Sequence, residues 1–100
     1  MTARFSISGR TALVTGGSAG IGLAITRLLI DQGCMRVLAV GRNGATLASI
    51  AAESERVTTL GADLSDSADI DMLLDRLPRL APDLSLLVNN AGSQLLTDFC

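Results

Sequence analysis

Short apolar runs alternate along the chain with segments whose apolar residues recur at helical spacing. The runs are bounded by glycine or polar residues and predict four buried strands, at Thr11–Thr15, Arg36–Val40, Val57–Leu60 and Leu84–Val88. Three helices are predicted between them: over 20–31, from an Asn43 cap onward, and from a cap at Ser65, Asp66 or Ser67 to Pro78. This alternation predicts a parallel sheet, because parallel neighbours need a crossover connection.

The same spacing predicts which side chains each helix turns toward the sheet. They are Ile21, Ala24, Ile25, Leu28 and Leu29 in the first helix, Leu47, Ile50 and Ala51 in the second, and Ile70, Leu73, Leu74 and Leu77 in the third. Right-handed crossovers then give a doubly wound α/β sheet of order 3-2-1-4, with two helices on one face and one on the other. On the one-helix face we expect Ala12–Val14 and Leu86–Val88 to be poorly covered, beside an open edge at the fourth strand.

A glycine-rich turn, Thr15-Gly-Gly-Ser-Ala-Gly-Ile-Gly22, joins the first strand to the first helix. Its glycines allow a sharp turn and a close approach of the backbone to a ligand. The helix start adds free N–H groups and a positive dipole end, which together suit a pyrophosphate. The alternative is a plain strand-to-helix turn. A P-loop is excluded, because the chain has no lysine.

Composition narrows the chemistry further. The 100 residues are 48% hydrophobic with a net charge of −2, which indicates one ordered domain without a basic patch for nucleic acid. The chain has no His, Lys, Tyr or Trp, which excludes histidine triads, Cys/His zinc sites, Schiff bases and a tyrosine acid. Cys34 and Cys100 are too few for a disulfide scaffold, and no signal peptide or membrane span is evident. We therefore expect a soluble, cytoplasmic protein with free thiols and no metal.

Three motifs at the ends of predicted strands resemble those of the short-chain dehydrogenase/reductase family. Thr-Gly-x-x-x-Gly-Ile-Gly at 15–22 is similar to its cofactor motif, Asp63-Leu64 follows the third strand, and Asn89-Asn90-Ala91-Gly92 follows the fourth. The three keep the family's order over roughly Gly9 to Gly92. The resemblance implies a Rossmann fold and a nicotinamide-dependent oxidoreductase acting on an alcohol or carbonyl group.

Carried over residue by residue, the resemblance gives a cofactor-binding role to Gly16, Gly20, Ile21, Gly22, Asp63, Leu64, Asn90, Ala91 and Gly92. The glycines shape the turn, and Ile21 offers a backbone amide to the pyrophosphate. Asp63 accepts from the adenine amino group with Leu64 beside it, and the Asn-Ala-Gly residues line the adenosine ribose. Alternatively, Asp63 caps the following turn, and Asn89 and Asn90 bond their own backbone.

The end of the second strand favours NADP(H) over NAD(H). NAD-preferring folds place an Asp or Glu about 20 residues past the glycines, and here no acidic residue lies between Asp31 and Glu53. Gly41 leaves room for a 2′-phosphate, Arg42 supplies a charged planar fork, and Ser18 adds a hydroxyl. The alternative for Arg42 is a solvated loop arginine.

The residues that carry the family's chemistry are absent from these 100 positions. The family uses a serine and a Tyr-x-x-x-Lys pair beyond the Asn-Asn-Ala-Gly turn, and this chain has no Tyr or Lys. We expect residues 1–100 to be one truncated cofactor-binding domain, inactive alone, and unstable or self-associating. The alternatives are a non-catalytic NADP(H)-binding or interaction module and a half that another polypeptide completes. The substrate cannot be inferred from this sequence.

Overall fold

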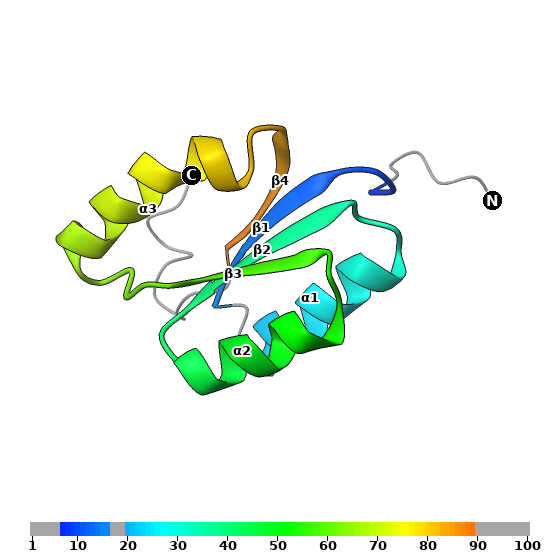
Figure 1. The fold of residues 1–100 in the computed structure, drawn as a ribbon, viewed down its shortest axis with the longest axis horizontal. Helices are drawn as coiled ribbons and strands as arrows, with labels where there is room; N and C mark the ends of the chain where they lie inside the picture. The colour runs from blue at the N-terminus through cyan, green and yellow to red at the C-terminus, as the bar shows by residue number, and fades with distance from the viewer. Residues whose placement is uncertain (1–6, 17–19, 90–100) are drawn as a thin grey trace.

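Four parallel strands form the middle layer of the molecule, and helices cover both faces of this sheet (Figure 1). The computed structural model describes residues 7–16 and 20–89. The strands are β1 (Thr11–Thr15), β2 (Arg36–Gly41), β3 (Val57–Gly61) and β4 (Leu84–Asn89), in the order β3-β2-β1-β4. The predicted fold class and strand order are confirmed. β2, β3 and β4 each run one residue further than predicted at their carboxyl ends.

The helices lie on the faces that right-handed crossovers require. α1 (Gly20–Asp31) and α2 (Gly44–Glu53) pack on one face of the sheet, and α3 (Ser67–Leu80) packs on the other (Figure 1). Successive strand residues point to opposite faces, so Leu13 and Leu38 join the cluster under α3, whereas Ala12 and Val14 join the cluster under α1. The two central strands, β1 and β2, are therefore buried on both sides.

The expectation that Ala12–Val14 would be poorly covered is wrong. All three side chains are buried, because Leu13 lies in the cluster below α3 while Ala12 and Val14 face α1. In β4, Leu86 and Val88 are half-buried on the α1 side, and Leu87 is 51% exposed. Poor coverage is therefore confined to β4.

Side chains cap the second and third helices as their sequences predict. Asn43 accepts a hydrogen bond from the Thr46 amide at 3.0 Å, and Asp66 accepts one from the Ala68 amide at 2.9 Å. The prediction that α3 ends at Pro78 is wrong, since the helix continues to Leu80. A proline in the last turn removes only one intrahelical hydrogen bond from the helix, which the remaining turn tolerates.

The buried face of α1 agrees only in part with the predicted one, since Leu29 is buried and Ile25 packs against the core as predicted. Gly22, Thr26 and Leu29 are buried, whereas Ile21 and Leu28 are 70% and 55% exposed and Ala24 is exposed as well. Apolar residues occur around most of this helix, so spacing alone does not select the face that meets the sheet. The buried Thr26 hydroxyl donates to the Gly22 carbonyl at 2.9 Å, which satisfies it inside the core.

The buried face of α3 also departs from the prediction. Leu73 is buried and Leu77 is half-buried, but Leu74 is 60% exposed and Ile70 is 37% exposed. Half-buried Met72 and Leu80, which the spacing did not select, also pack against this cluster. One flank of α3 is therefore apolar and uncovered.

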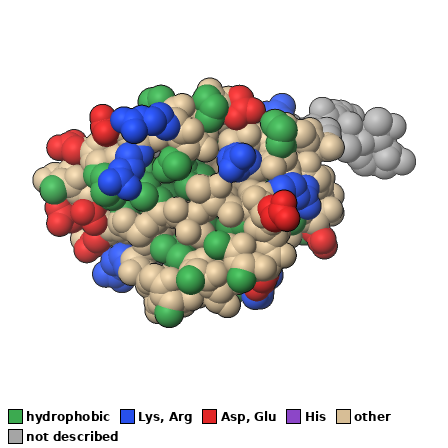
Figure 2. Space-filling model, viewed as in Figure 1, with side chains coloured by type: hydrophobic (Ala, Val, Ile, Leu, Met, Phe, Trp, Pro, Cys, Tyr) green, Lys and Arg blue, Asp and Glu red, His purple; other side chains and the backbone are tan. Residues whose placement is uncertain are grey.

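Charges of both signs are interspersed over the face seen in Figure 2, with acidic side chains gathered over the start of α3. Cys34 is buried and has no disulfide partner within 7–16 and 20–89. Burial raises the pKa of its thiol, against the nearby charges of Arg56 and Arg10. No helix in the described part of the chain is long and apolar enough to cross a membrane.

Candidate cofactor site

The candidate site lies at the carboxyl edge of the sheet. Because all four strands are parallel, their last residues meet there: Thr15 of β1 pairs with Asn89 of β4, and Gly41 of β2 pairs with Gly61 of β3. The chain leaves β1 toward β2 and returns on the other side of β1 as β4, so a crevice is expected where the direction reverses. The loops after β1, β2 and β3 carry the predicted site residues to this edge.

Two glycines of the first loop have backbone conformations that other residues rarely adopt. Gly16 has a φ of 69° and Gly20 a φ of 55°, both in the left-handed region. The Gly16 amide donates to the Val40 carbonyl at 2.8 Å, which ties the turn to β2. A Cβ added at Gly20 would meet no atom within 4 Å, so the protein itself leaves that space open. The turn is thus shaped by glycine, as predicted.

The start of α1 is suited to an anion. The first turn of an α-helix leaves its N–H groups without intrahelical partners, and its dipole end is positive. No acidic residue lies in the first turn of α1 to compete with a bound phosphate. Ile21 lies there with its side chain exposed and Gly22 is buried one position later, while Ser18 lies outside the described residues.

The loop after β2 places Arg42 at the same edge. Its side chain is exposed, while Gly41 before it is buried. Asn43 after it is committed to capping α2, and the first turn of α2 contains no acidic residue. Arg42 is therefore a guanidinium without a carboxylate on its own loop.

Asp63 follows β3 and caps the turn after it, which is one of the two roles that the sequence leaves open. Its Oδ1 accepts hydrogen bonds from the Ser65 amide at 3.0 Å and the Ser65 hydroxyl at 2.6 Å, while its own amide donates to Asp69 at 2.7 Å. The bonds from the Ser65 hydroxyl and amide, and the nearby charge of Arg42, hold the pKa of Asp63 below its ordinary value against some desolvation. Its other oxygen, Oδ2, accepts no hydrogen bond from the described residues.

Leu64 lies on the other side of this loop, half-buried against the cluster beneath α3. Asn90, Ala91 and Gly92 lie outside the described residues, so their predicted roles stay predictions. The structure thus brings Gly16, Gly20, Ile21, Gly22, Arg42 and Asp63 to one edge of the sheet.

One pair at this edge was missed by the sequence reasoning. The Thr15 hydroxyl donates to Asn89 Oδ1 at 2.9 Å, which joins the ends of β1 and β4. The signal was available: both residues are the last of their strands, and strands 1 and 4 were predicted neighbours. The sequence places Asn89 in the Asn-Asn-Ala-Gly motif or in a turn, and does not indicate this contact, because Thr15 lies 74 positions away.

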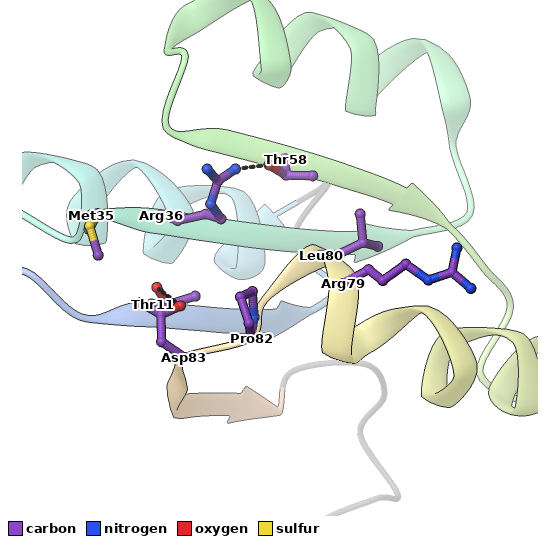
Figure 3. Close-up of a pocket in the computed structure, with 8 residues that line it drawn as sticks. All are labelled: Thr11, Met35, Arg36, Thr58, Arg79, Leu80, Pro82 and Asp83. Atoms are coloured by element: carbon purple, nitrogen blue, oxygen red, sulfur yellow. Dashed lines mark hydrogen bonds between the residues drawn. The ribbon is translucent and has the colours of Figure 1, made fainter.

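A pocket of about 420 Å³ lies at the opposite, amino edge of the sheet (Figure 3). Eight residues line it: Thr11, Met35, Arg36, Thr58, Arg79, Leu80, Pro82 and Asp83. Their polar groups bond to each other, with Arg36 donating to Thr58 Oγ1 at 2.8 Å and Thr11 to Asp83 at 3.0 Å. None of the predicted site residues within 7–16 and 20–89 lines this pocket. Among residues 7–16 and 20–89, no group of three or more His, Cys, Asp or Glu could hold a metal ion.

Comparison with known proteins identifies the family. The sequence model of the family described as short chain dehydrogenase matches residues 10–99. The chain belongs to this family. The recognised resemblance is therefore confirmed, and with it membership in a family of oxidoreductases with a nucleotide-binding Rossmann fold.

Individual relatives agree with this assignment. The chain is 37% identical over 93 residues to the uncharacterized oxidoreductase DltE of Bacillus subtilis, covering 93% of this chain and 36% of the relative. It is 41% identical over 95 residues to the 3-oxoacyl-(acyl-carrier-protein) reductase of rhamnolipid biosynthesis from Pseudomonas aeruginosa, covering 89% and 36%.

A solved structure also superposes well. It is described as the Pseudomonas aeruginosa RhlG/NADP active-site complex, and the match has a TM-score of 0.80 with 41% identity. The match covers 93% of this chain and 37% of that one. The 100-residue chain thus spans a little over a third of the length of these relatives.

Proposed function

We propose that this chain is the NADP(H)-binding part of a short-chain dehydrogenase that oxidises an alcohol or reduces a carbonyl group. The observation that carries the proposal is the placement of Arg42 at the end of β2, close enough to Asp63 to lower the pKa of that carboxyl. A 2′-phosphate would meet a guanidinium there and no acidic residue between Asp31 and Glu53. The related structure that contains NADP supports the same cofactor.

The rest of the carboxyl edge fits the remainder of the dinucleotide. Gly16 and Gly20 keep the turn free of side chains, so backbone amides at the start of α1 can approach the pyrophosphate. Asp63 is held ionised, and its Oδ2 can accept from the adenine amino group. We assign Ser18, Leu64 and Asn90–Gly92 the supporting contacts that the family resemblance implies.

These residues bind and orient the cofactor but transfer no proton. When bound, NADPH supplies the hydride for reduction of a carbonyl group. An alcohol or carbonyl also needs a general acid or base with a pKa near neutrality. The 100 residues contain no Tyr, Lys or His that would serve, so we propose that this stretch alone does not catalyse turnover. The proposal places the protein in the cytoplasm, where a thiol such as that of Cys34 stays reduced.

Calorimetric titration of the 100-residue chain with NADPH and with NADH tests the assignment. We expect NADPH to bind about tenfold or more tightly, which corresponds to at least about 1.4 kcal/mol. Equal affinities would reject the NADP(H) preference, and no binding of either cofactor would reject the cofactor site itself. Incubation of the same protein with NADPH and a panel of carbonyl compounds should give no oxidation of the cofactor.

A further inference from the structure

The loop that joins β3 to α3 is fixed to the sheet at its start (Figure 1). The Ala62 amide donates to the Gly41 carbonyl at 2.8 Å, so the contact between β2 and β3 continues to the residue before Asp63. Ala62 is itself buried in the cluster below α3. Since Arg42 directly follows Gly41, this bond holds the Asp63 and Arg42 positions close together at the carboxyl edge.

The loop then folds back and engages both backbone groups of Asp63. The Asp63 amide donates to Asp69 Oδ2 at 2.7 Å, and the Asp63 carbonyl accepts from the Asp66 amide at 3.0 Å. Asp69 is half-buried in the first turn of α3, whose start is fixed by the Asp66 cap. Residue 63 can therefore change its backbone direction only by breaking these hydrogen bonds.

Ser65 holds the side chain of Asp63. Its hydroxyl donates to Asp63 Oδ1 at 2.6 Å, and its amide donates to the same oxygen at 3.0 Å. The hydroxyl bond is the largest cause of the lowered pKa of Asp63. Two donors on one oxygen fix the rotation of the carboxylate. They leave Oδ2 as the one polar atom of Asp63 that forms no hydrogen bond with residues 7–16 and 20–89.

We propose that Ser65 and Asp69 are positioning residues for the adenine ring. Asp69 sets the backbone of Asp63, and Ser65 turns its carboxylate so that Oδ2 accepts from the exocyclic amino group. This inference rests on the proposed function and adds to it two residues that act through Asp63. A carboxylate that is fixed before the ligand arrives loses less freedom on binding, so it binds more tightly than one that the ligand must order.

A double-mutant cycle on the 100-residue chain separates positioning from structural support. Ser65→Ala should weaken NADPH and NADH equally, by about threefold, because both cofactors contain adenine. In the Asp63→Asn background it should have no further effect, since that variant has already lost the acceptor for adenine. Ser65→Thr keeps the hydroxyl and should retain the affinity. Ser67→Ala is the matched control, because Ser67 is also exposed but is not a donor to Asp63.

The backbone contact is tested at Asp69. Asp69→Ala should also weaken both cofactors by about threefold, because the Asp63 amide loses its acceptor. Asp69→Asn should retain the affinity, since an amide oxygen still accepts from that N–H group. Asp71→Ala is the control for loss of a carboxylate from α3, because Asp71 is exposed and accepts no hydrogen bond from Asp63.

NMR titration of the Asp63 carboxyl group without cofactor checks the arrangement itself. The pKa of Asp63 should be higher in Ser65→Ala than in the unmodified chain, because the carboxylate loses a donor, and should not rise in Ser67→Ala. Circular dichroism shows whether each variant is folded. A pKa that does not rise in Ser65→Ala would show that Ser65 does not hold this carboxylate.

The binding measurements can fail in distinguishable ways. A loss of affinity in Ser65→Ala that persists in full in the Asp63→Asn background would show that Ser65 does not act through Asp63. Unchanged affinity in both Ser65→Ala and Asp69→Ala would reject the positioning role and leave the proposed function intact. Absence of NADPH binding by the unmodified chain would reject the proposed function, and this inference with it.

Discussion

The two edges of the sheet carry similar residue types but leave them in different states. At the amino edge, Arg36 donates to Thr58 and Thr11 donates to Asp83, so polar groups there bond to one another. At the carboxyl edge, Asp63 keeps one oxygen without a hydrogen bond from the described residues, and the first turn of α1 offers N–H groups. Only the second edge combines such a carboxylate with the N–H groups at the start of a helix.

The comparison of the two edges shows that a surface pocket is not by itself a binding site. The amino edge has a pocket of about 420 Å³, yet Arg79 extends away from Thr11 and Asp83 in Figure 3. The carboxyl edge combines left-handed glycines, an ionised carboxylate and a guanidinium. Variants matched across the two edges can test whether this contrast governs binding.

The largest expected effect comes from the glycines. Gly20 and Gly9 both have positive φ, 55° and 78°, and a Cβ at either meets no atom within 4 Å. Alanine at either position should cost about 1–2 kcal/mol of folding free energy. Only Gly20→Ala should weaken NADPH binding, by about 3 kcal/mol, since its methyl group would displace the pyrophosphate from several backbone donors. Thermal unfolding and calorimetry separate the two effects, and equal NADPH affinities in both variants would remove the turn from the site.

The next effect concerns the arginines. Arg42→Asp should weaken NADPH binding by about 1.5–3 kcal/mol through loss of a charge-assisted contact and added repulsion. NADH, which has no 2′-phosphate, should be affected much less. Arg79→Asp, at the amino edge, is the control and should change neither affinity. A common loss in both variants would show that overall charge, rather than the Arg42 position, controls binding.

The smallest effect comes from the carboxylates. Asp63→Asn should weaken NADPH and NADH equally, about fivefold, because the adenine amino group loses an ionised acceptor. Asp83→Asn, which alters the acceptor of Thr11 at the amino edge, should leave both affinities unchanged. A loss of NADPH affinity alone in Asp63→Asn would place this carboxylate near the 2′-phosphate instead.

Asp63 should also influence acid stability. Its pKa is lowered in the folded chain, so its stabilising effect is present above the ordinary value of 3.8 and is lost as pH falls through the lowered pKa. The melting temperature of Asp63→Asn should therefore fall less than that of the unmodified chain between about pH 5 and pH 3. If the melting temperatures of the two proteins fall by the same amount over this range, Asp63 is not a source of acid sensitivity.

Most of the fold follows from local sequence signals, whereas the side of each helix that packs on the sheet does not. Strand runs bounded by glycine and the caps at Asn43 and Asp66 act over a few residues, and the structure agrees with them. The orientation of α1 depends on how the whole helix seats on the sheet, and its apolar surface is too broad to predict that Ile21 and Leu28 stay exposed.

In the candidate site, too, some features follow from local sequence signals and others depend on tertiary structure. The turn glycines and Arg42 follow from their places at strand ends, which the sequence alone indicates. The Thr15–Asn89 bond needs the register of β1 against β4, and the contact of Asp63 with Ser65 needs the path of the chain after β3. Such contacts follow from tertiary geometry.

The position of β4 in the sheet has a consequence for folding order. A hydrogen bond between β2 and β3, from Arg36 to Thr58, closes a loop of 22 residues, whereas the one from Thr15 to Val88 closes 73. Loop-closure entropy grows with this separation, and strands that pair across it form late. We expect β4 to dock last onto the preformed β1–β3 layer and to be the first strand released in local unfolding. The amides of β4 should then exchange with solvent faster than those of β1, β2 and β3.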